Sequence, residues 1–139
     1  MNKIIALQGA PSVGKTTTIG KLYESLSQRG YTIILPKARQ GSKDFFVVFE
    51  KNNKTIGITT YGETASLIKY RLARFIKENC SVIVCACHEE GTLKHRFVKN
   101  YPLFIKRYII KSVTPEPESQ EVVNSSDANT ILDIIESEM

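Results

Sequence analysis

The chain has 139 residues, 42% of them hydrophobic, which suits one core of ordinary size and leaves no room for a large separate lid or substrate domain. It shows no signal-peptide pattern, and no apolar run approaches the roughly eighteen residues of a membrane span. The three cysteines form an odd count, which favours reduced thiols. We therefore expect a cytoplasmic protein without disulfides and without a membrane partner.

The charges are divided unevenly along the chain. All 19 Lys and Arg residues fall at or before Lys111, so residues 1–113 carry 19 basic and seven acidic side chains, a formal charge of +12. The last 26 residues carry seven acids and no base. A basic body suits an anionic ligand, either nucleotide or nucleic acid, and the acidic tail is able to fold back over it. A solvated surface with a solubilising tail would explain the same charges.

The first two predicted elements are a strand and a helix. Residues 3–8, KIIALQ, form a continuous apolar run ending at Gly9, which predicts a central buried strand. Residues 15–28 place apolar side chains three and four positions apart, which predicts an amphipathic helix.

A second strand and a hairpin follow. Residues 31–35, YTIIL, predict another buried strand closed by Pro36, and the polar residues 37–43 predict an exposed loop. The runs DFFVVFE and KTIGITT flank KNN, which predicts a β-hairpin. Its three phenylalanines favour core packing over stacking on a base.

The remaining sequence predicts two helices and two strands. Residues 63–79 predict an amphipathic helix whose basic side chains, Arg71 among them, mostly face outward. Residues 81–87 and 103–110 predict buried strands, with a helix or loop over 92–100.

The C-terminal residues predict a separate unit. Residues 114–125 read as an acidic linker, and residues 126–139 as a short helix capped by Ser126 or Asp127. Residues 1–113 then form the main domain. Strands alternating with helices predict an α/β fold with three layers: a mainly parallel sheet, helices on both faces and one β-hairpin.

One motif carries most of the chemistry. Gly9, Gly14, Lys15 and Thr16 match G-x-x-x-x-G-K-[ST] between a predicted strand and a predicted helix, where a phosphate-binding loop requires them. Backbone amides of such a loop donate to phosphates, the lysine bridges the terminal phosphates and the threonine hydroxyl ligates Mg²⁺. The candidate nucleotide-binding residues here are Gly9, Ser12, Val13, Gly14, Lys15, Thr16 and Thr17, with Thr16 as the metal ligand and Lys15 as a catalytic residue.

This loop resembles the Walker A loop of the P-loop NTPase superfamily over residues 3 to about 28. The resemblance implies a P-loop NTPase-like fold over residues 1–113, which binds a nucleoside triphosphate with Mg²⁺. The guanine signature N-K-x-D is absent, so ATP is the expected nucleotide. Neither SVIVCAC nor YTIIL ends in the aspartate that members of this superfamily usually carry at the end of a second buried strand.

The stretch TIGITTYGET is similar to the D-x-x-G switch of GTPases, with Thr59 in place of the aspartate and Gly62 in place of the glycine. In that family the glycine amide binds the γ-phosphate and the next residue positions the attacking water. The next residue here is Glu63, which we expect to be catalytic, although it also suits a helix cap.

His88, Glu89 and Glu90 are the competing site residues, because they follow a buried strand. Cys85, Cys87 and His88 are a poor zinc set, since the two cysteines share one face of a strand and no second ligand pair exists.

Three functions remain open. The favoured one is a small ATPase or switch. A small nucleotide or metabolite kinase would need an acceptor held by residues 37–43 or by Lys94 and Arg96, but kinases of this superfamily normally carry a lid with paired arginines. A nucleotide-regulated nucleic-acid-binding partner protein would use the basic body. By analogy with other small members, we expect a homo-oligomer or a larger protein partner to complete the site in trans.

Overall fold

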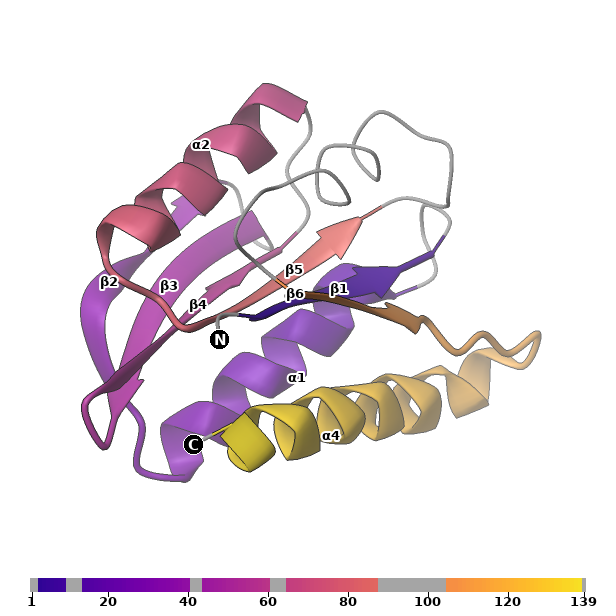
Figure 1. The fold of residues 1–139 in the computed structure, drawn as a ribbon. Coiled ribbons are helices and arrows are strands. Elements are labelled where there is room, and N and C mark those ends of the chain that lie inside the picture. The colour runs from indigo at the N-terminus through magenta and orange to yellow at the C-terminus, as the bar shows by residue number, and fades with distance from the viewer. Residues whose placement is uncertain (1–2, 10–13, 41–43, 61–64, 88–104, 139) are drawn as a thin grey trace.

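The computed structural model describes residues 3–9, 14–40, 44–60, 65–87 and 105–138. These residues form one six-stranded sheet with helices on both faces (Figure 1). The elements are β1 (Lys3–Gln8), α1 (Lys15–Gln28), β2 (Thr32–Gln40), β3 (Asp44–Lys51), β4 (Lys54–Thr59), α2 (Ala65–Lys77), β5 (Val82–Cys87), β6 (Ile105–Ile110), the 3₁₀ turn η1 (Pro117–Ser119) and α4 (Gln120–Glu138).

The sheet is mixed. Its strand order is β2-β3-β4-β5-β1-β6. The four strands β4, β5, β1 and β6 run parallel, whereas β2 pairs with β3 and β3 with β4 in antiparallel fashion. The predicted parallel part is therefore confirmed, and the antiparallel part is one strand wider than the predicted hairpin.

The hairpin itself is confirmed. Its turn residues Asn52 and Asn53 have positive φ values of 55° and 64°. A two-residue loop with both central residues left-handed matches the right-handed twist of the flanking strands, and asparagine tolerates that conformation better than most residues.

Strand β2 corrects two predictions. It continues to Gln40 instead of closing at Pro36, so residues 37–40 belong to the strand and not to a loop. It is also an edge strand, with Ile33 41% and Ile34 43% exposed. Its pairing with β3 shifts register between Ile33 and Leu35 and again between Leu35 and Ala38. Proline has no N–H to donate, and an irregular edge strand tolerates that loss.

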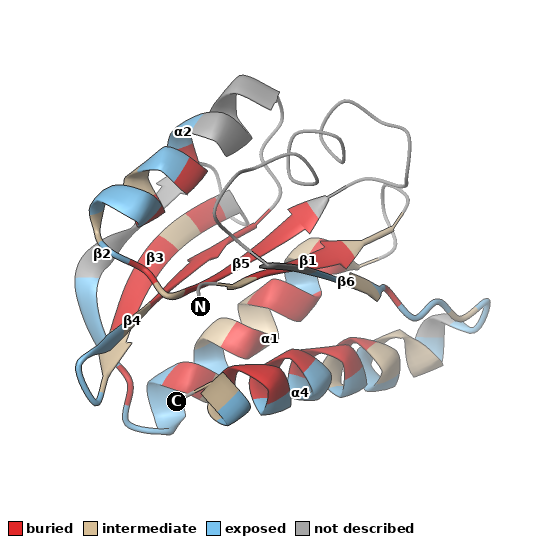
Figure 2. Ribbon diagram, in the orientation of Figure 1, coloured by how far each residue is buried: buried red, intermediate tan, exposed pale blue. Residues whose placement is uncertain are grey.

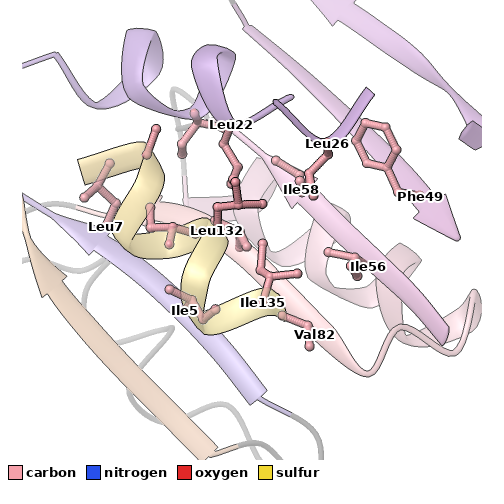
Figure 3. Packing of buried hydrophobic residues seen from close by; sticks show 14 of the residues in the cluster. Ile5, Leu7, Leu22, Leu26, Phe49, Ile56, Ile58, Val82, Leu132 and Ile135 are labelled. Atoms are coloured by element: carbon pink, nitrogen blue, oxygen red, sulfur yellow. The ribbon is translucent and has the colours of Figure 1, made fainter. Parts of the chain in front are cut away.

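Two hydrophobic clusters lie on opposite faces of the sheet (Figure 2). On one face α1 and α4 pack side by side, and Figure 3 shows Leu132 and Ile135 of α4 among residues of α1 and the central strands. On the other face Leu72 and Phe75 of α2 pack with residues of β1, β3 and β5. The predicted layering, with helices on both faces, is therefore present.

Helix α4 corrects the prediction for the C-terminal residues. It begins at Gln120, six residues before the expected start, so residues 120–125 are helical and Asp127 is an interior residue instead of a cap. Its buried side chains recur at helical spacing along the face toward α1: Asn124, Asp127, Ala128, Ile131, Leu132, Ile134 and Ile135. The helix is thus part of the main core. A domain boundary near residue 113 stays a prediction.

Ion pairs join α4 to the basic body. Glu138 lies 2.6 Å from Lys3, Glu121 3.3 Å from Lys21 and Glu136 3.7 Å from Arg29. A buried pair joins Asp127 to Lys111 at 3.0 Å. The acidic tail therefore folds back over the basic surface, as its charge suggested. No helix within the described ranges is long and apolar enough to cross a membrane.

Candidate functional site

The glycine loop joins β1 to α1 at the edge of the sheet where the parallel strands end. Gln8, the last residue of β1, pairs with Cys87 of β5 on one side and with Ile110 of β6 on the other. Ligands of open α/β sheets bind beyond such carboxyl ends. Of the predicted loop residues, Ser12 and Val13 lie outside the described residues, whereas Gly9, Gly14, Lys15, Thr16 and Thr17 lie within them.

Gly14 supplies the backbone conformation that starts the helix. It is the N-cap of α1 with a φ of 95°, a left-handed value that glycine adopts without steric cost. The first turn of α1 contains no acidic residue. The positive end of this helix is thus oriented toward the loop with no carboxylate of its own first turn to neutralise it.

Lys15 is buried in the loop instead of extending into solvent. Its side chain is only 6% exposed, and its Nζ donates a hydrogen bond to the carbonyl oxygen of Gly9. The ammonium group therefore bridges the two ends of the loop. A lysine in this position concentrates positive charge beside the helix N-terminus.

The three threonines after Lys15 differ in their surroundings. Thr18 is buried, and its hydroxyl donates to the Gly14 carbonyl at 2.8 Å, so it supports the first helical turn. Thr16 is half-buried and Thr17 is exposed. Of the three, Thr16 directly follows the buried lysine, as the motif for a metal-binding hydroxyl requires.

The other catalytic candidates follow β4 and β5 in the sequence. All five lie outside the described residues: Gly62 and Glu63, and the competing His88, Glu89 and Glu90. The strand order nevertheless separates the two groups. Strand β5 pairs directly with β1, whereas β4 is one strand farther away, about 10 Å from β1 at ordinary strand spacing. The end of β5 therefore lies closer to the end of β1 than the end of β4 does.

Thr59, at the aspartate position of the switch-like stretch, has a structural role in the sheet. It is fully buried, and its hydroxyl lies within hydrogen-bond distance of two acceptors, the carbonyl oxygens of Phe45 and Thr60, at 3.3 and 3.0 Å. Arg71 of α2 donates to the same hydroxyl oxygen at 3.0 Å. These bonds hold the end of β4 in place.

The prediction that Arg71 faces outward is wrong. Its side chain is 1% exposed, and its guanidinium lies over the ring of Phe46, 5.4 Å from the ring centre. Arg71 is four residues before Phe75, so it lies on the same helix face as a core residue. That spacing was a sequence signal that the charge of Arg71 obscured.

The described cysteines support no metal site. Cys80 and Cys85 are both buried, and burial raises the pKa of the Cys80 thiol to about 12. No group of three or more metal-binding side chains occurs among the residues with a described position. Two members of the zinc set considered above, Cys87 and His88, have side chains that lie outside the described part of the structure.

The chain is similar in sequence to a bacterial receptor protein. It is 30% identical over 132 residues to the signal recognition particle receptor FtsY of Bacillus subtilis (strain 168). The match takes in 91% of this chain and 39% of the receptor, so the chain spans about two fifths of the length of that relative. No family model matches the chain, and no solved structure matches it.

The similarity points to the P-loop NTPase superfamily, which the glycine loop also resembles. The mixed six-stranded α/β fold is compatible with that class. Fold, loop and similarity together suggest a nucleotide-binding protein of this kind.

Proposed function

We propose that the chain binds a nucleoside triphosphate with Mg²⁺ at residues 9–17 and hydrolyses it as a small ATPase or switch. The observation that carries this proposal is Lys15, whose buried ammonium lies inside the glycine loop at the N-terminus of α1. A triphosphate needs clustered positive charge and hydrogen-bond donors. The loop offers both.

The loop also fits the chemistry of the ligand. Lys15 donates to a backbone carbonyl that a phosphate oxygen is able to replace as acceptor, with a gain in charge complementarity. The glycine at position 14 permits close approach of the backbone. Thr16 would hold Mg²⁺ through its hydroxyl oxygen, and the ion would neutralise charge on the phosphates.

ATP remains the proposed nucleotide because the N-K-x-D guanine signature is absent from the sequence. GTP is the alternative to be compared directly, because the stretch TIGITTYGET is similar to the switch of GTPases. Glu63, with Gly62 before it, remains the proposed group at the γ-phosphate. The alternative is Glu89 or Glu90, because both follow β5 in the sequence and β5 is the direct neighbour of β1. We further propose that the protein acts in the cytoplasm and that a second copy or a larger protein completes the site.

Incubation with γ-labelled ATP or GTP and Mg²⁺, with and without nucleosides, nucleotides and DNA, tests this function. Free labelled phosphate supports hydrolysis, and label on an acceptor supports a kinase instead. If Glu63 activates water, Glu63→Gln lowers turnover by about a hundredfold or more while nucleotide affinity stays within a few fold. Normal turnover in Glu63→Gln with a comparable loss in Glu89→Gln or Glu90→Gln would move the catalytic carboxylate to the end of β5.

A further inference from the structure

Asn124 of α4 contacts the glycine loop directly. Its side chain is 3% exposed and lies against Gly14. A Cβ atom built on Gly14 would lie 2.6 Å from Oδ1 of Asn124 and 3.1 Å from its Nδ2. The carboxamide therefore occupies the space that a side chain at position 14 would need.

The carboxamide oxygen of Asn124 is buried without accepting a hydrogen bond from any residue that the structure describes. A buried polar atom without a partner costs free energy, and an apolar side chain of the same shape would avoid that cost. Such an atom in a native protein calls for an explanation beyond packing.

Asp127, three residues later on the same helix face, fixes α4 to the end of β6. Its carboxylate accepts hydrogen bonds from the backbone N–H and the hydroxyl of Ser112, both at 2.8 Å, and pairs with Lys111. The backbone N–H of Lys111 in turn donates to the Gln8 carbonyl at 2.8 Å. Asn124 thus supports the end of the glycine loop at Gly14 directly. Asp127 supports the other end, at Gln8, through Lys111.

We propose that Asn124 is a positioning residue of the glycine loop, and that its carboxamide oxygen accepts a backbone hydrogen bond from the loop when a nucleotide binds. The inference rests on the proposed function. The backbone N–H groups of Thr16 and Thr17, in the first turn of α1, have no acceptor within the helix itself, so these two donors lie close to Gly14. An open acceptor at this point disfavours the nucleotide-free loop relative to the bound one, and so couples α4 to nucleotide affinity.

The substitution Asn124→Leu tests this role, because leucine has nearly the same shape and cannot accept a hydrogen bond. We expect the unfolding midpoint without nucleotide to stay equal or to rise, while affinity for Mg·ATP or Mg·GTP, measured by isothermal titration, falls by about tenfold. Asn129→Leu, at an exposed position of the same helix, is the matched control and should change neither quantity. Asn124→Ala, which cannot crowd Gly14, provides a second variant and should also lose affinity.

Two results would overturn the role of Asn124. One is wild-type affinity in both Asn124 variants. The other is a parallel fall of nucleotide-free stability and affinity in both, which would show that the side chain only packs. A wild-type protein that binds neither nucleotide would refute the proposed function itself, and this inference with it. Binding by the wild type together with unchanged variants would refute the inference alone.

Discussion

At the scale of single residues, Gly57 shows how closely α2 approaches the sheet. A Cβ atom on Gly57 would lie 2.5 Å from the ring of Phe75, and both residues are buried. We expect Gly57→Ala to lower the free energy of unfolding by about 1–3 kcal/mol, because the ring has to move within a packed core. Denaturant titration measures the change.

Gly20 offers the matched control for that substitution. It lies inside α1, and a Cβ atom built on it would meet nothing within 4 Å. Gly20→Ala should therefore raise stability by about 0.5–1 kcal/mol, since alanine is the better helix former. A loss of stability at Gly20, or none at Gly57, would contradict this account of the packing.

Thr16 gives a second prediction at this scale. Thr16→Val keeps the volume of the side chain but removes the proposed metal-binding oxygen, so the Mg²⁺-dependent part of nucleotide affinity should vanish while the metal-free part survives. Titrations with and without EDTA separate the two parts. Equal losses under both conditions would assign the hydroxyl to support of the loop.

Tyr31 links stability to alkaline pH. Burial, together with the hydrogen bond that its hydroxyl donates to Glu136 at 3.0 Å, raises its pKa to about 12 from the usual value of 10.0. The folded state then holds the phenol proton more tightly than the unfolded state does. The stabilisation is complete below pH 10 and is lost as the pH rises from about 10 to about 12.

The test compares urea midpoints of the wild type and Tyr31→Phe across that range. The wild type should lose more stability than the variant between pH 10 and pH 12, because phenylalanine has no proton to lose. Parallel curves would show that this tyrosine ionises normally in the folded state.

At the scale of elements, α4 depends on one buried ion pair. The side chains of Lys111 and Asp127 are 0% and 8% exposed. Asp127→Asn would leave the lysine charge buried without its counter-ion, which typically costs about 3–5 kcal/mol of stability. Asp133→Asn, on the exposed face of the same helix, should cost far less. Similar unfolding midpoints for the two variants would argue against a structural role for the pair.

Two inward-facing polar residues, Asn124 and Asp127, explain why the start of α4 was predicted six residues too late. Ala128, Ile131, Leu132 and Ile135 form an apolar pattern that is visible in the sequence. Asn124 and Asp127 continue that face toward the N-terminus, but their polarity resembles a cap and a linker. Only tertiary contacts with Gly14, Lys111 and Ser112 show that they face inward.

Other elements were predictable to different degrees for physical reasons. The strand and helix around the glycine loop follow from local periodicity, and the hairpin follows from its turn residues. The position of β2 at the edge of the sheet does not, because strand order depends on contacts distant in sequence. For the candidate site, the motif predicts Lys15 in the loop but does not predict its burial.

At the scale of the whole molecule, the fold brings three parallel strand ends and two helices to one loop. Strands β5 and β6 flank β1, α1 starts from the loop, and α4 lies along α1 (Figure 1). The terminal segments are joined by the ion pair of Lys3 with Glu138, which lowers the pKa of Glu138. The acidic helix therefore stabilises the body by charge and by packing.

The central claim is that this loop binds a triphosphate through Lys15. Isothermal titration of Mg·ATP and Mg·GTP into the wild type, Lys15→Ala and the control Lys21→Ala tests it most directly; Lys21 lies on the same helix in an ion pair with Glu121. We expect the wild type and Lys21→Ala to bind one of the two nucleotides with similar affinity, and Lys15→Ala to remain folded but not to bind. Wild-type affinity in a folded Lys15→Ala would contradict the account.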